Sequence, residues 1–104
     1  MQIVIGGRDM ALTIWKYKIP LTDEFSLDMP GDPQMLTVQV QPQQGIMLWA
    51  LVDPRRSNQT RHFRLAGTGH PIDYEPHDLR FVGSFQLEEG ALIFHLFEVL
   101  TGPF

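Results

Sequence analysis

The chain has 104 residues, no cysteine and a formal net charge of −4 at pH 7. This length suits a single domain, and the lack of cysteine excludes disulfides and thiolate metal sites. Hydrophobic residues make up 43% and charged residues 19% of the chain, which is typical of a folded rather than a disordered protein. The mild acidic charge argues against binding of long nucleic acid, which is a polyanion.

The N-terminus lacks the features of a signal peptide, because it has no basic flank and its apolar run covers only residues 3–5. The longest apolar stretch, Ile46 to Val52, is far too short for a membrane span. We therefore expect a cytoplasmic protein without a membrane partner. Met10 is a plausible alternative start. Residues 1–11 are predicted as an N-terminal extension or edge strand, and residues 12–104 as a single β domain.

Alternation of apolar and polar side chains predicts strands in the first half of the chain. Trp15, Tyr17 and Ile19 alternate with two lysines before Pro20 ends the strand. The same period of two predicts strands at residues 24–29 and 36–41, which a Pro- and Gly-rich turn at 30–33 separates. The run 46–52 is apolar on both faces, which favours a strand in the centre of a sheet.

Three further strands are predicted in the second half, at residues 62–65, 81–87 and 91–100, with a hairpin turn at 88–90. A long loop with one helical turn is expected at 70–78. Seven strand candidates and no clear 3.6-residue period predict a mainly β fold, a single small antiparallel sandwich or barrel of about 6–8 strands with little or no helix. The aromatic residues expected in its core are Trp15, Trp49, Phe63, Phe81, Phe85, Phe94 and Phe97.

Basic residues concentrate in one acid-free segment, between Asp53 and Asp73. Arginine forks and glycine-rich turns can both bind anions. If the first two arginines sit on a hairpin tip, they could converge with those of the next strand on an anionic, nucleotide-like ligand. The alternative is that they are ordinary solvated side chains. The candidate ligand-binding residues are Arg55, Arg56, Arg61, Arg64, Gly67, Thr68, Gly69 and His70.

Catalytic and metal-binding patterns are weak in this sequence. His70, Asp73 and His77 share a polar loop, but their spacing matches no metal signature. His95 lies in an apolar strand, which favours a hydrogen-bonded core histidine over a catalytic base. No serine lies in a nucleophile elbow, and no phosphate-binding or dinucleotide motif is present. We therefore predict no catalytic residue, no metal and no cofactor.

Five sequence blocks are distinctive in combination: Ile14-Trp-Lys-Tyr-Lys-Ile-Pro-Leu-Thr-Asp23, Leu48-Trp-Ala-Leu-Val-Asp-Pro54, Gly67-Thr-Gly-His-Pro-Ile72, Phe81-Val-Gly-Ser-Phe-Gln86 and Ala91-Leu-Ile-Phe-His-Leu-Phe-Glu98. Over residues 12–99 the chain resembles a family of small phage and prophage proteins. The resemblance implies a phage-derived origin, but it brings no known activity and no assigned catalytic residue.

These features favour a phage-encoded accessory protein that acts by stoichiometric binding in the host cell. Its partner would be a host or defence protein, or an anionic small molecule such as a nucleotide. One alternative is a structural or decoration protein of the virion, and another is a metal-dependent hydrolase that uses His70, Asp73 and His77. A homodimer is also plausible, because a small β domain has edge strands that can pair.

Overall fold

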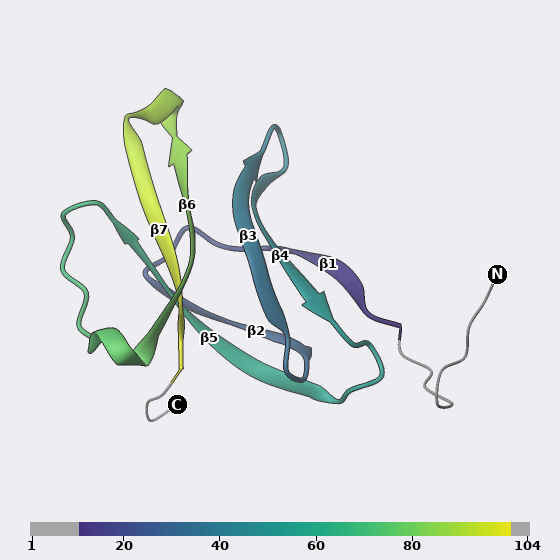
Figure 1. Ribbon diagram of the computed structural model, residues 1–104. Coiled ribbons are helices and arrows are strands. Elements are labelled where there is room, and N and C mark those ends of the chain that lie inside the picture. Colours follow the sequence, from purple (N-terminus) through teal and green to yellow (C-terminus); the bar gives the residue numbers. More distant parts are fainter. Residues whose placement is uncertain (1–10, 101–104) are drawn as a thin grey trace.

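A computed structural model describes residues 11–100, which fold into two antiparallel sheets (Figure 1). The first sheet has the strand order β1–β4–β3, with β1 at Thr13–Lys18, β3 at Gln34–Gln41 and β4 at Gly45–Val52. The second has the order β2–β5–β7–β6, with β2 at Glu24–Pro30, β5 at Asn58–Gly67, β6 at Leu79–Leu87 and β7 at Leu92–Val99. The 3-10 turns η1 (Pro76–Asp78) and η2 (Glu88–Gly90) flank β6.

This arrangement confirms the predicted mainly β class, and the expected helical turn in the loop 70–78 is η1. Strand β4 is indeed central, between β1 and β3, as its two apolar faces predicted. Strand β5 is longer than the predicted 62–65 because its polar first half also pairs with β2. The proposed strand within residues 1–10 lies outside the described residues. Within residues 11–100, no helix is both long and apolar enough to cross a membrane.

The core lies between the two sheets, where β3 packs against β6. Close approach is possible because Gly83 of β6 has no side chain: a Cβ there would lie 3.1 Å from Cγ1 of Val38 on β3. The two sheets are otherwise held by apolar side chains of alternating strand positions. The buried cluster consists of Ile19, Met29, Val38, Ile46, Leu48, Phe63, Leu65, Phe85 and Leu96.

Strand β6 contains an irregularity that overturns one sequence prediction. Phe81 and Phe85 are an even number of residues apart, which predicted that both face the core. The register shifts between Phe81 and Gly83, so the bulge turns Phe81 to the outer face, where it is 59% exposed. There it contacts Phe97 edge-on at 5.5 Å, whereas Phe85 stacks on Phe94 on the inner face at 5.8 Å.

Two tryptophans also differ from the prediction that they belong to the core. Trp15 is opposite Ala50, but β1 is an edge strand with a neighbour on one side, and Trp15 is 41% exposed. Trp49 alternates with the core residue Leu48 and therefore points to the outer face of its sheet. Phe63, by contrast, is 1% exposed and occupies the core as predicted.

Tyr17 on β1 packs against the core, yet its buried hydroxyl has no hydrogen-bond partner among the described residues. Burial raises the pKa of this phenol. A buried hydroxyl without a partner loses its hydration and gains nothing in return. This group is therefore a local defect in the packing.

We expect Tyr17→Phe to raise the free energy of unfolding by about 1 kcal/mol, because it removes the unpaired hydroxyl and keeps the ring. Urea denaturation measures the change. The matched control is Tyr74→Phe, which removes a hydroxyl that donates to Oε1 of Glu24 at 3.1 Å and should not stabilise. A Tyr17→Phe variant less stable than the wild type would contradict the assignment.

Candidate functional site

Arg55 and Arg56 lie at the turn between β4 and β5, as the sequence predicted, but both are paired within the protein. Nε and Nη2 of Arg55 each donate to a carboxylate oxygen of Asp53 at 3.0 Å. The backbone N–H of Arg55 donates to the same carboxylate at 3.0 Å, which closes an Asx turn. Arg56 reaches back to Asp32, with 3.0 Å between Nη1 and Oδ2. These contacts fix the turn and neutralise its two cations.

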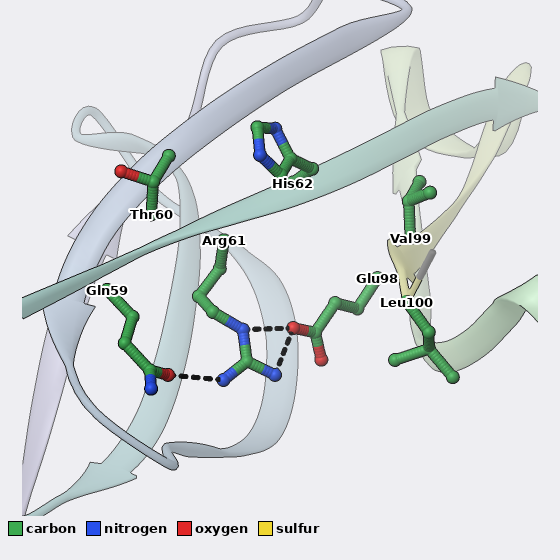
Figure 2. A pocket seen from close by; sticks show the side chains of 7 residues that line it. All are labelled: Gln59, Thr60, Arg61, His62, Glu98, Val99 and Leu100. Carbon is green, nitrogen blue, oxygen red and sulfur yellow. Dashed lines mark hydrogen bonds and ion pairs between the residues drawn. The ribbon is translucent and has the colours of Figure 1, made fainter. Parts of the chain in front are cut away.

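Arg61 points to the inner face of its sheet, toward the end of β7. Its Nε donates to Oε2 of Glu98 at 2.6 Å, and its Nη1 donates to Gln59 at 3.2 Å (Figure 2). The Glu98 residue is 1% exposed. Its other oxygen, Oε1, is buried without a hydrogen bond in the described part of the chain, and Nη1 of Arg80 lies 3.9 Å away. A buried carboxylate thus lies between two guanidinium groups.

The guanidinium group of Arg64 donates hydrogen bonds to the backbone and is largely shielded from solvent. It donates to the carbonyl oxygens of Leu65 at 2.7 Å, Pro71 at 3.0 Å and Asp23 at 3.2 Å. The side chain is 12% exposed. Arg64 therefore fastens the loop that follows β5 to the segment that precedes β2.

Residues 67–70 form a tight turn at the far end of β5. The N–H of His70 donates to the carbonyl of Gly67 at 3.0 Å, and the N–H of Thr68 donates to Ile93 at 3.1 Å. Gly69 has a φ of +90°, a conformation that favours glycine. The turn lines a hollow of about 230 Å³ with residues 91–94. Two of its N–H groups are thus occupied by carbonyls rather than directed at a ligand.

The structure therefore does not gather the candidate residues in one place. Arg55 and Arg56 lie at one end of β5 and the turn 67–70 at the other, roughly 30 Å apart at about 3.3 Å per strand residue. Arg61 and Arg64 point to opposite faces of the sheet, because they differ by an odd number of positions. The expected convergence of the arginines on one ligand is wrong, whereas anion binding at any single place stays a prediction.

A histidine network was missed as a network, although His95 itself was expected to be hydrogen-bonded. Its Nδ1 lies 2.7 Å from Oγ of Ser84, and its Nε2 lies 2.7 Å from Oγ1 of Thr68. The tautomer of the imidazole decides which of the two hydroxyls donates and which accepts. The network ties β7 to β6 and to the turn after β5.

The pocket around Arg61 was also missed by sequence reasoning. It has a volume of about 400 Å³, and residues 59–62 of β5 and 98–100 at the end of β7 line it (Figure 2). One sequence signal could have revealed it. Glu98 continues the inward-facing positions of Phe94 and Leu96, and a carboxylate at such a position requires a buried partner.

A second surface is the outer face of the β1–β4–β3 sheet. Ile14 is 56% and Leu36 is 40% exposed there. Together with Trp49 they line a shallow hollow of about 290 Å³. Leu36 reaches this face at a register shift in β3 between Met35 and Thr37, and bulges commonly redirect a side chain in this way.

Within residues 11–100, no three His, Asp or Glu side chains gather in a group that could hold a metal ion. His70, Asp73 and His77 therefore form no such cluster, although they share one loop.

These features define a small two-sheet β domain with one apolar outer face and one polar pocket beside a buried ion pair. A comparison with protein families matches residues 10–102 to a domain of unknown function, DUF7352. The chain belongs to this family. The matched range includes the whole stretch on which the resemblance was based. No curated protein and no solved structure matches the chain.

The ion pair between Asp53 and Arg55 should make a pH-dependent contribution to stability. The side-chain hydrogen bonds of Arg55, followed by its backbone N–H, lower the pKa of Asp53 from 3.8 to about 2. The ionised carboxylate therefore stabilises the fold above pH 3.8, and this contribution is lost as the pH falls through about 2.

We expect Asp53→Asn, which keeps the shape of the Asx turn, to lower the midpoint of thermal unfolding at pH 7. The difference from the wild type should shrink below pH 3.8 and vanish as the pH falls below about 2. Thermal unfolding followed across this range measures it. A difference that stays constant with pH would show that the charge of Asp53 does not stabilise the turn.

Substitutions of Arg61 and Glu98 should have strongly non-additive effects on stability, because the two residues form an ion pair. Arg61→Met and Glu98→Leu should each lower the free energy of unfolding by about 3 kcal/mol. The first removes the closer cation beside the buried Glu98, and the second leaves Arg61 without its carboxylate. The double variant should be more stable than either single variant. Urea denaturation of the wild type, the two single variants and the double variant gives the coupling energy. If the two single effects add up to that of the double variant, a direct interaction is excluded.

Proposed function

We propose that the chain is a phage-encoded accessory protein that acts by stoichiometric binding to a host or defence protein in the host cytoplasm. The outer face of the β1–β4–β3 sheet is the proposed contact surface. The phage origin rests on the sequence resemblance described above. The family assignment brings no activity, and the chemistry of this surface is the support for the proposal.

The observation that carries the proposal is the exposed apolar area on this face. The side chains of Ile14 and Leu36 are about half exposed and line the hollow beside Trp49. Contiguous exposed apolar surface is uncommon in monomeric proteins unless it binds something. Aromatic side chains in such hollows often dominate the energetics of an interface.

Charge on this face favours an acidic partner over a second copy of the chain. The register places Lys16 beside Trp49 and Lys18 beside Met47, and the three strands contain no acidic residue. The Nζ of Lys16 donates to Gln41 at 2.8 Å on the far side of β4. Two copies meeting through this face would bring lysines of like charge together. A partner with an acidic rim around an apolar centre would complement it.

The anionic small-molecule version of the hypothesis receives less support. All four arginines in its segment are paired with carboxylates of the same chain, and Arg64 also donates to backbone carbonyls. Virion assembly also uses apolar surfaces, but it needs contacts between many copies.

The test is affinity capture from infected cells with tagged wild-type protein and two substituted forms. We expect a partner that purifies with the wild type in a fixed ratio. Ile14→Glu with Leu36→Glu should weaken its binding by at least about tenfold, because charge then replaces apolar contact. The matched control is Phe81→Glu, which replaces an exposed apolar residue on the other sheet and should bind normally.

Equal capture by all three forms would remove the outer face as the contact surface. Recovery of the protein in purified virus particles, with no host protein bound, would replace this proposal with the structural alternative. Circular dichroism must show that both substituted forms are folded.

A further inference from the structure

Strand β5 is longer than the neighbour that covers one of its edges. On one side it pairs with β2 from Asn58 to Arg64. On the other side it pairs with β7 from His62 to Gly67. Among the described residues, no strand pairs with residues 58–61 on the β7 side. Within residues 11–100, the four-stranded sheet thus has a notch where β7 ends.

The backbone groups that face this notch follow from the hydrogen-bond pattern of β5. The N–H of Leu65 donates to Asp23, and the carbonyl of Ser57 accepts from Gly31, so odd-numbered residues direct their polar groups toward β2. The register between them is continuous. Successive residues of an antiparallel strand point their N–H and C=O to opposite sides. Asn58 and Thr60 therefore direct two donors and two acceptors into the notch.

The notch coincides with the pocket of about 400 Å³. Four strand residues span about 13 Å at roughly 3.3 Å each, which is enough for a short extended segment to pair with the exposed edge. An open backbone edge is the feature that peptide-binding β domains use when a ligand adds a strand.

Beside the notch, two guanidinium groups face one carboxylate, that of Glu98. Arg61 has five N–H donors, of which one on each terminal nitrogen has no partner among the described residues. The side chain of Arg80 is 61% exposed, and its nearest carboxylate oxygen is 3.9 Å away. Two guanidinium groups share the single carboxylate of Glu98, so a second carboxylate beside them would be stabilised.

Glu98 supplies an independent sign that the site is incomplete. Its Oε1 is buried and accepts no hydrogen bond in the described part of the chain. A buried carboxylate oxygen without a donor is costly. A peptide carboxylate that draws Arg80 toward the notch would bring a donor to this oxygen, which now lies just beyond hydrogen-bond distance.

We infer that the notch binds an extended acidic peptide from a partner protein by strand addition to residues 58–61 of β5. The peptide backbone pairs with Asn58 and Thr60, and an Asp or Glu side chain on the inner face meets Arg61 and Arg80. This inference does not depend on the proposed function of the outer face, which lies on the other sheet.

The test uses fluorescently labelled hexapeptides in which Glu alternates with β-branched residues, against the full-length protein. Matched sets carry Gln or Lys at the Glu positions. We expect the Glu peptides to bind at least about tenfold more tightly than the Gln peptides, since a charged hydrogen bond is replaced by a neutral one. The Lys peptides should not bind measurably. Fluorescence anisotropy gives the affinities.

Two protein variants separate backbone pairing from charge. Thr60→Pro removes an N–H that faces the notch and should abolish binding. Its matched control, Thr60→Ala, loses only the hydroxyl that donates to Asp28 at 2.7 Å and should bind as the wild type does. Arg80→Gln should weaken the Glu peptides by about tenfold, whereas Lys18→Gln on the other sheet should not change their affinity.

Three outcomes would overturn the inference: no peptide binding at millimolar concentration, equal binding of Glu and Gln peptides, or wild-type binding by Thr60→Pro. If Thr60→Pro does not fold, peptides methylated on alternate backbone nitrogens test the same hydrogen bonds with the wild-type protein. Inorganic phosphate and a nucleotide are run in parallel. Saturable binding of either that displaces no peptide and survives Thr60→Pro, with no peptide binding, would replace the strand site with a small-anion site.

Discussion

Side chains alternate between the two faces of a strand, and along β5 this alternation separates residues that the sequence places close together. Phe63 and Leu65 enter the core, so Arg61 must share the inner face while Arg64 takes the outer one. The backbone obeys the same rule, and Asn58 and Thr60 therefore point away from β2. Both the buried ion pair and the open edge follow from the register that the core residues of β5 impose.

The ion pair between Arg61 and Glu98 carries a desolvation cost at the edge of the core. Glu98 continues the inner face beyond Leu96, at a position where an apolar residue would pack without desolvating a charge. Arg61 satisfies Oε2, but Oε1 has no donor among the described residues. Apolar replacements of such pairs are often neutral or stabilising, so the contribution of these charges to folding does not by itself account for them. Their position beside the open edge favours a role in recognition.

Periodicity and turn residues predicted the strands and the central position of β4, and the polar loop 70–78 was expected to hold one helical turn, because each depends on residues that are close in sequence. It failed at Phe81, where one extra residue in β6 reversed the face, since a bulge has no reliable sequence signal. Periodicity also could not predict which carboxylates the arginines bind. Arg56 binds Asp32 and Arg61 binds Glu98, partners 24 and 37 residues away, and strand order alone brings them together.

The chain carries a net charge of −4, yet the two candidate surfaces are both positive. Lys16 and Lys18 lie beside the apolar face, and Arg61 and Arg80 lie beside the notch. Many of the acidic residues are instead in turns or paired with arginines. Such a distribution keeps the whole molecule soluble through its net charge while each surface attracts negative charge locally. The basic residues are therefore set apart from the acidic ones, but they lie on two sheets rather than in one loop. Each surface would recognise an acidic partner by different chemistry. The first sheet would bury apolar side chains, and the second would pair its backbone with an added strand.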